Sequence, residues 1–167
     1  MRRPEYFIEN QKGGANVHEN LSFKISSLII ISHVKDGIEI AKKHKLPKPI
    51  VDIIPQHHGT TFLEYFYRES LLRGDKISKE SFRYPGPKPQ TREAAIVMVA
   101  DTVEAAIRAQ PRQKLSKLIN IIYELIKAKI DDGQFENVDL TIADINKIRN
   151  VFLKMIMGFY HTRIQYK

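Results

Sequence analysis

Residues 91–107 read TREAAIVMVADTVEAAI, a run of small and apolar side chains with one carboxylate, Asp101, embedded in it. Because the apolar residues occur almost all round a helical projection, the pattern predicts a helix that is buried on most sides. Asp101 would then be buried as well, and an isolated buried carboxylate costs several kcal/mol unless a cation offsets its charge. The run therefore predicts both a central helix and a partner for Asp101.

Apolar residues recur at helical spacing on both sides of this run. Five further helices are expected, over about residues 22–45, 49–58, 61–72, 115–130 and 141–160. Pro111 is expected to end the helix of residues 91–107 or to start the next one, and Asp144 is the expected capping partner of Thr141. No convincing alternating strand or internal repeat is present, so the predicted fold class is all-α.

Two segments are not expected to be helical. Residues 1–20 are interpreted as a lead-in, since they carry only one short apolar group. Residues 73–90 end in YPGPKPQ, which is too rich in proline for a helix or a central strand. We interpret this second segment as a rigid loop that can form the rim of an active site.

Composition limits the class of protein. The 167 residues are 43% apolar, enough for one domain over residues 1–167 with a continuous core. The absence of cysteine excludes disulfides and thiolate metal sites, and fits a reducing cytosol. No apolar run approaches the roughly 20 residues that span a bilayer, so the chain as given is expected to be soluble. The net charge of +8 attracts phosphates, nucleic acid or anionic lipid without choosing among them.

The histidines are the second candidate feature. His33 falls inside the predicted helix of residues 22–45, and His57 and His58 are adjacent. Each alone is more often a structural residue than a ligand, but imidazoles together with the Asp101 carboxylate suit Mn, Fe, Co, Ni or Zn. Neighbours on one helix diverge by about 100°, so His57 and His58 are expected to reach two different ions, or an ion and a substrate phosphate. This pattern favours a two-metal site.

Four motifs carry a family resemblance. In chain order they are ISHVKDG (31–37), QHHGT (56–60), YPGPKPQT (84–91) and ADTVEAA (100–106). Together they resemble the intracellular HD domains of seven-transmembrane receptor-type HD hydrolases, a family known for cyclic di-AMP phosphodiesterases. The resemblance runs in order along essentially all of the chain. It implies an HD-domain-like helical bundle in which His33, His57, His58 and Asp101 match metal ligands.

The same resemblance implies two divalent ions, Mn or Fe, in the complete domain and a cyclic dinucleotide as substrate. Two metals would neutralise the scissile phosphate and activate a water for in-line attack, which gives a linear dinucleotide as first product. The resemblance also implies a parent protein with membrane helices upstream, which would place this domain on the cytosolic face.

Substrate contacts are expected from four residues. Arg108 follows Asp101 by seven residues, two helical turns along the same face, and could grip a phosphate with two hydrogen bonds. Gly86 and Lys88 belong to the proline-rich loop, and Thr60 follows the histidine pair. For each of them a purely structural role is an open alternative.

The chain departs from the family pattern in two places. The family has an earlier histidine and an HDIGK motif, and these 167 residues contain neither. By alignment that motif would end directly before Met1, so weak metal binding is expected and catalytic silence stays open. Pro55 removes a backbone donor just before the histidine pair and is expected to disturb that helix.

Two other functional classes stay open. One is a catalytically silent helical module that docks on other domains of its parent protein. The other is a basic nucleic-acid-binding domain, which would bind polynucleotides in a salt-sensitive way. Neither explains the position of Asp101 in its apolar run, and no polynucleotide partner is expected.

Overall fold

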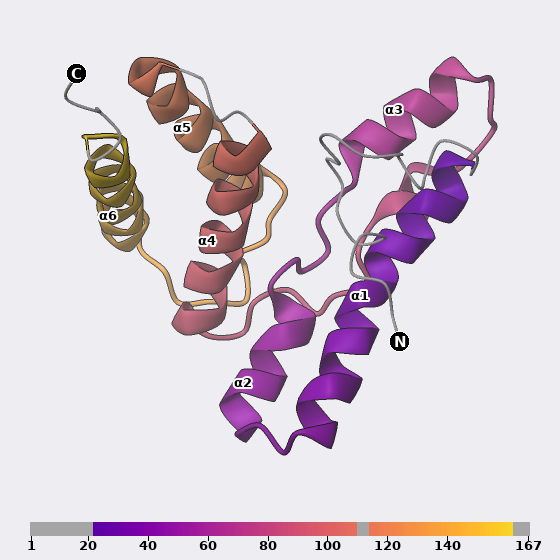
Figure 1. Cartoon of the computed structure of the whole chain (residues 1–167), viewed down its shortest axis with the longest axis horizontal. Helices are drawn as coiled ribbons and strands as arrows, with labels where there is room; N and C mark the ends of the chain where they lie inside the picture. Colours follow the sequence, from indigo (N-terminus) through magenta and orange to yellow (C-terminus); the bar gives the residue numbers. More distant parts are fainter. Residues whose placement is uncertain (1–21, 110–113, 162–167) are drawn as a thin grey trace, which may run out of the picture. The chain divides into compact units, whose positions relative to one another are not determined.

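The computed structural model describes residues 22–109 and 114–161, and Figure 1 shows that these residues are predominantly helical. In the described part of the chain the only β pairing is an isolated antiparallel bridge between Phe62 and Arg83. The predicted all-α class is therefore confirmed. The chain divides into two compact units, residues 1–87 and residues 88–167.

The first unit is built on a long helix. Helix α1 spans Phe23–Lys43, and the Oγ of Ser22 caps it by accepting a hydrogen bond from the Ile25 N–H at 3.3 Å. Two lysines in its last turn complement the helix dipole. The remaining elements of the unit are α2 (Lys48–Ile53), the 3₁₀ turn η2 (Ile54–Gln56), α3 (Glu64–Leu72) and the 3₁₀ turn η3 (Lys79–Phe82).

The core of the first unit lies between α1, α3 and the chain at the end of η3. Its buried members are Ile30, Val34, Leu63, Phe66, Phe82 and Tyr84. Residues 61–63 run antiparallel to residues 82–84, because the Leu63 N–H donates to the Phe82 carbonyl and the Tyr84 N–H to the Thr61 carbonyl, both at 2.9 Å. This short pairing replaces the first turn of the helix predicted from residue 61, and α3 begins only at Glu64.

The predicted helix over residues 49–58 is too long. The α-helix stops at Ile53, and the chain tightens into η2 around Pro55 before it reaches the histidine pair. Proline lacks the N–H that an α-helix needs at this position, which explains the change. Gly59, directly after the histidine pair, has a φ of 54° and donates its N–H to the Gln56 carbonyl at 3.0 Å.

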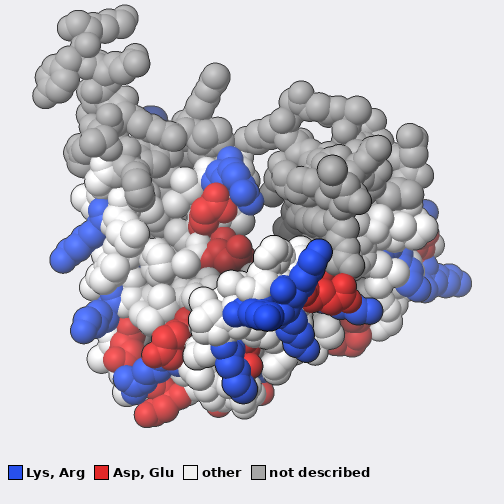
Figure 2. Space-filling view, turned by 60° about the horizontal axis from the view of Figure 1, so that its bottom comes forward, with Lys and Arg blue, Asp and Glu red and all other residues white. Residues whose placement is uncertain are grey.

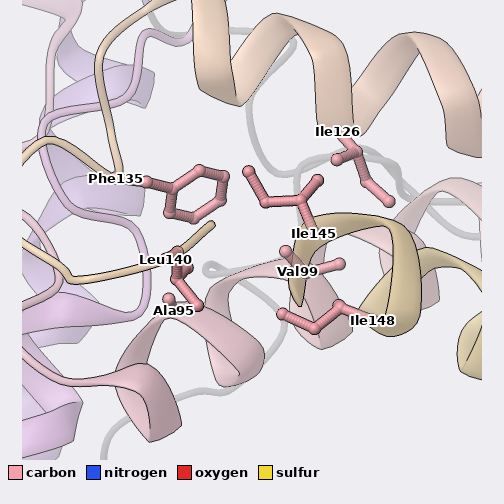
Figure 3. A pocket seen from close by; sticks show the side chains of 7 residues that line it. All are labelled: Ala95, Val99, Ile126, Phe135, Leu140, Ile145 and Ile148. Atoms are coloured by element: carbon pink, nitrogen blue, oxygen red, sulfur yellow. The ribbon is translucent and has the colours of Figure 1, made fainter. Parts of the chain in front are cut away.

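The second unit is a three-helix arrangement of α4 (Arg92–Ala109), α5 (Leu115–Asp131) and α6 (Ile142–His161). Its buried core comprises Val99, Val103, Ile122, Ile126 and Ile156. Figure 3 shows a small gap in this core, whose apolar lining is Ala95, Val99, Ile126, Phe135, Leu140, Ile145 and Ile148. The volume open to a water-sized sphere is about 10 Å³, roughly one water, so this gap is a packing feature and not a ligand site.

Helix α4 is less buried than the sequence predicted. Its buried residues are Ala94, Ala95, Met98, Val99 and Val103, and they follow helical spacing. Ile96 is 41% exposed and Val97 is 38% exposed. Asp101 is half-buried rather than fully buried. The helix buries one broad side, and the small alanines there allow close packing against its neighbours.

Within the described residues, α5 and α6 end close to where they were expected. Gly133, with a φ of 64°, follows the last turn of α5. Thr141 and Asp144 form the predicted capping pair, with the Asp144 N–H donating to Thr141 Oγ1 at 3.1 Å and the Thr141 N–H donating to Asp144 Oδ2 at 3.0 Å. The expectations for residues 1–20 and for Pro111 fall outside the described part of the chain.

Two surface properties bear on the function. Over residues 22–109 and 114–161, every helix is too short or too polar to cross a bilayer. On the face shown in Figure 2, lysine and arginine side chains are interspersed with aspartate and glutamate side chains.

We expect Thr141→Ala to lower the free energy of unfolding by about 1 kcal/mol, the usual loss when a helix N-cap is removed. Urea unfolding followed by circular dichroism would measure it. The hydrogen bonds from Thr141 hold the pKa of the Asp144 carboxyl below its usual range. Its stabilising effect is therefore present above a pH of about 4 and is lost as the pH falls through the folded-state pKa.

The matched control is Ser116→Ala, which removes an exposed hydroxyl from the first turn of α5. This variant should unfold at nearly the wild-type urea concentration. Equal destabilisation of the two variants would contradict the capping role of Thr141. An effect of Thr141→Ala that stays constant down to low pH would contradict the contribution of the Asp144 carboxylate.

Candidate metal centre

The structure brings three of the four predicted ligands together in the first unit. His33 lies in the middle of α1, and His57 and His58 follow directly after η2. One ligand atom from each of the three imidazoles lies within 4.8 Å of the other two. All three side chains are half-buried, so the cluster is sheltered but open to an ion.

Hydrogen bonds to the backbone orient two of these rings. His33 Nδ1 lies 2.5 Å from the Ile30 carbonyl oxygen, and His57 Nδ1 lies 2.6 Å from the Ile54 carbonyl oxygen. A carbonyl oxygen can only accept, so each Nδ1 must carry the proton. In the neutral imidazole the lone pair is then on Nε2, which is the tautomer of a metal ligand.

The two Nε2 atoms face each other. Nε2 of His33 lies 3.2 Å from Nε2 of His57. Two lone pairs at this separation repel unless a cation, either a proton or a metal ion, lies between them. Imidazole nitrogens lie about 2.0–2.1 Å from a bound zinc ion, so two nitrogens that subtend about 90–110° at one ion are about 2.8–3.4 Å apart. The observed separation therefore fits two ligands of one divalent ion.

The expected divergence of His57 and His58 is wrong. Their ring centroids are 4.0 Å apart and their planes differ by 38°. The prediction assumed that both residues belong to one α-helix, whereas the helix ends before them and the turn allows both rings onto the same side. The centroid of His58 is also only 4.9 Å from that of His33, so all three histidines can serve one ion.

Gly37 is a positioning element that the motifs alone do not reveal. A Cβ added to Gly37 would lie 3.2 Å from Cγ2 of Ile54, which is a tight contact. The glycine therefore lets η2 approach α1 one turn after His33, and this approach brings His57 within reach of His33. Gly37 is the last residue of the ISHVKDG motif, but a glycine within a helix does not by itself identify the residue that packs against it.

The other predicted site residues have defined places. Asp101 is carried by α4 in the second unit, whereas the histidine cluster belongs to the first, and its role as a ligand stays a prediction. Arg108 Nη2 lies 3.5 Å from Glu104 Oε2 on an exposed part of α4. Lys88 Nζ lies 2.7 Å from Glu136 Oε1. Each of these two cations thus has a carboxylate partner within its own unit.

The remaining two candidates lie in loops of the first unit. The carbonyl of Thr60 accepts a hydrogen bond from Arg83 Nη1 at 2.9 Å, two residues after His58. Gly86 has a φ of 83° and precedes a cis peptide bond to Pro87. Substrate contact by Thr60, Gly86, Lys88 and Arg108 stays a prediction.

The sequence also matches a family model, since residues 11–106 fit that of the HD domain. The chain belongs to the HD domain family. This result confirms the resemblance drawn from the four motifs. The three histidines all lie within the matched segment, and so does Asp101.

Named relatives are similar over nearly the whole chain. The cyclic-di-AMP phosphodiesterase PgpH of Bacillus subtilis (strain 168) is 45% identical over 165 residues, 99% of this chain. The protein of the same name from Listeria monocytogenes serotype 1/2a (strain 10403S) is 46% identical over 164 residues, 98% of this chain. The chain spans only 23% of the length of each relative.

Solved structures are similar as well. The HD domain of L. monocytogenes PgpH superposes with a TM-score of 0.87 at 45% identity, covering 95% of this chain and 74% of that chain. The same domain in complex with cyclic-di-AMP superposes with a TM-score of 0.88 at the same identity and coverage.

We expect His57→Ala to weaken binding of Mn²⁺ or Co²⁺ by at least about 10–100-fold. Removal of a residue that only supports a ligand already costs about this much affinity, and His57 is a proposed ligand itself. Isothermal titration calorimetry on chelator-treated protein would measure it. Binding by the wild type should also weaken as the pH falls, because protons compete for the Nε2 lone pairs.

His44→Ala is the matched control, since His44 is an exposed histidine at the end of α1. It should bind metal as the wild type does. Equal losses in the two variants would mean that the measured binding is not at the histidine cluster.

Proposed function

We propose that this chain is the histidine-bearing part of a metal-dependent HD phosphodiesterase that hydrolyses cyclic di-AMP, with His33, His57 and His58 holding one divalent ion. The observation that carries this proposal is the convergence of the His33 and His57 Nε2 atoms at 3.2 Å, with His58 beside them. The relatives named as cyclic-di-AMP phosphodiesterases support the substrate, and the match to the HD domain supports the reaction class.

The donor set fits a transition metal better than Mg²⁺ or Ca²⁺, because those ions prefer oxygen ligands alone. Among transition metals we propose Mn or Fe. Since the three histidines converge on one position, a second ion would need other ligands. We propose Asp101 as one of these, together with the His-Asp motif that the family carries and these 167 residues lack.

A bound ion supplies Lewis acidity toward the phosphate and lowers the pKa of a coordinated water. The chain's own contribution is to keep three neutral nitrogen donors aimed at one point by the backbone hydrogen bonds of His33 and His57. In the hydrolysis, the water oxygen bonds to phosphorus, the ester bond to one ribose oxygen breaks, and that oxygen receives a proton. Opening one of the two phosphodiesters gives a linear dinucleotide.

We further propose that the chain is part of a larger protein whose membrane region lies upstream, with this domain on the cytosolic side. The family resemblance supports this arrangement, and the relatives are long enough to contain such a region, since the chain spans 23% of their length.

The test joins the segment that bears the His-Asp motif of the Listeria domain to this chain. We expect the chimera with Mn²⁺ to convert cyclic di-AMP to the linear dinucleotide, as chromatography would show, because the segment completes the ligand set. The chain alone should be much slower. His58→Ala in the chimera should reduce turnover to background, whereas His44→Ala should not.

Two results would count against this proposal. Turnover by the chain alone at the rate of the chimera would mean that the His-Asp motif is dispensable. A folded, metal-loaded chimera without turnover would favour the silent interaction module instead.

A further inference from the structure

Tyr84 forms one wall of the histidine cluster. Its phenol ring is stacked on the imidazole of His58, with centroids 4.3 Å apart and planes 26° apart. It also meets the ring of His33 edge to face at a centroid distance of 6.0 Å. Only 4% of Tyr84 is exposed, so the ring is part of the packed interior beside the cluster.

Hydrogen bonds connect the segment that carries Tyr84 to the segment that carries His58. The Tyr84 N–H donates to the Thr61 carbonyl at 2.9 Å, and Arg83 Nη1 donates to the Thr60 carbonyl at 2.9 Å. Thr61 in turn donates to the His58 carbonyl, through its N–H at 3.0 Å and through Oγ1 at 2.7 Å. The segment that carries Tyr84 is thus hydrogen-bonded to Thr60 and Thr61, which lie two and three residues after His58.

We propose that Tyr84 is a positioning residue for the metal half-site, which fixes the plane of the His58 ring so that its nitrogen faces the same ion as His33 and His57. Hydrogen bonds from Nδ1 to backbone carbonyls orient the other two rings. At His58 the stack with Tyr84 restricts rotation of the imidazole. This inference rests on the proposed metal half-site and adds a residue outside its ligand set.

The chemistry of the stack favours the metal-bound state. An imidazole that coordinates a divalent ion loses electron density to it, and the face of a phenol ring carries the negative part of the aromatic quadrupole. The attraction between the two rings should therefore grow when His58 coordinates metal. An aliphatic side chain in the place of Tyr84 could fill the space but could supply neither the flat surface nor the negative face.

The test is titration of the chelator-treated chain with Co²⁺, which reports both affinity and the visible absorption of the coordinated ion. Tyr84→Leu should weaken Co²⁺ binding by about 10–100-fold, as loss of outer-shell partners does, and should change the absorption bands. Tyr84→Phe keeps the ring and should restore both. Phe82→Leu is the control, because Phe82 is equally buried on the same segment but its ring packs edge to face on Tyr67.

The outcomes separate this inference from the function it rests on. Wild-type protein that gives no Co²⁺ band would overturn the metal half-site and the role of Tyr84 with it. A wild-type band together with unchanged binding in Tyr84→Leu would overturn the role of Tyr84 alone. Failure of Tyr84→Phe to rescue binding, or an equal loss of affinity in Phe82→Leu, would also overturn the role of Tyr84 and leave the metal half-site standing.

A measurement on the wild type avoids any folding defect of the leucine variant. Nuclear Overhauser contacts between the ring protons of Tyr84 and His58 should be present in the metal-loaded chain. The chain is loaded with Zn²⁺ for this measurement, because a diamagnetic ion leaves these contacts visible. Their absence would show that the two rings are not stacked when the site is loaded, and the proposal would fall.

Discussion

The site depends on one constraint, the backbone hydrogen bonds that place the protons of His33 and His57 on Nδ1. With that tautomer fixed, two lone pairs point at each other across 3.2 Å. This arrangement is unfavourable without a cation and favourable with one, so the geometry favours a positive charge between the two nitrogens. The packing of α1 against η2 maintains this preference, because the two rings come from these two segments.

That packing is a consequence of local chain chemistry. Pro55 ends the α-helical hydrogen bonding early, and the chain continues as η2. His57 and His58 therefore follow a 3₁₀ turn and not an α-helix. Gly37 allows Ile54 to approach α1 one turn beyond His33. The positive φ of Gly59 then redirects the chain toward residues 61–63, which pair with residues 82–84. Each step uses a residue with special backbone freedom or restriction.

Much of the fold could be predicted, because apolar residues at helical spacing mark α1, α5 and α6, and the Thr141–Asp144 pair marks the start of α6. The three histidines could be selected from motifs. Their mutual geometry could not, because the expected divergence of His57 and His58 assumed that the helix continued. Helix α4 was expected to be buried on most sides, yet Ile96 and Val97 are exposed, so apolar composition alone overstated its burial.

The charge of the three histidine ligands supports the proposed phosphodiester hydrolysis. Three neutral imidazoles cancel none of the charge of a divalent ion, so an ion held by them alone keeps its full attraction for anions. A phosphate oxygen is then a natural further ligand, and binding it neutralises part of the excess charge in a half-buried site. In the proposed function, the neutral charge of the three ligands would therefore favour binding of an anionic substrate to the ion.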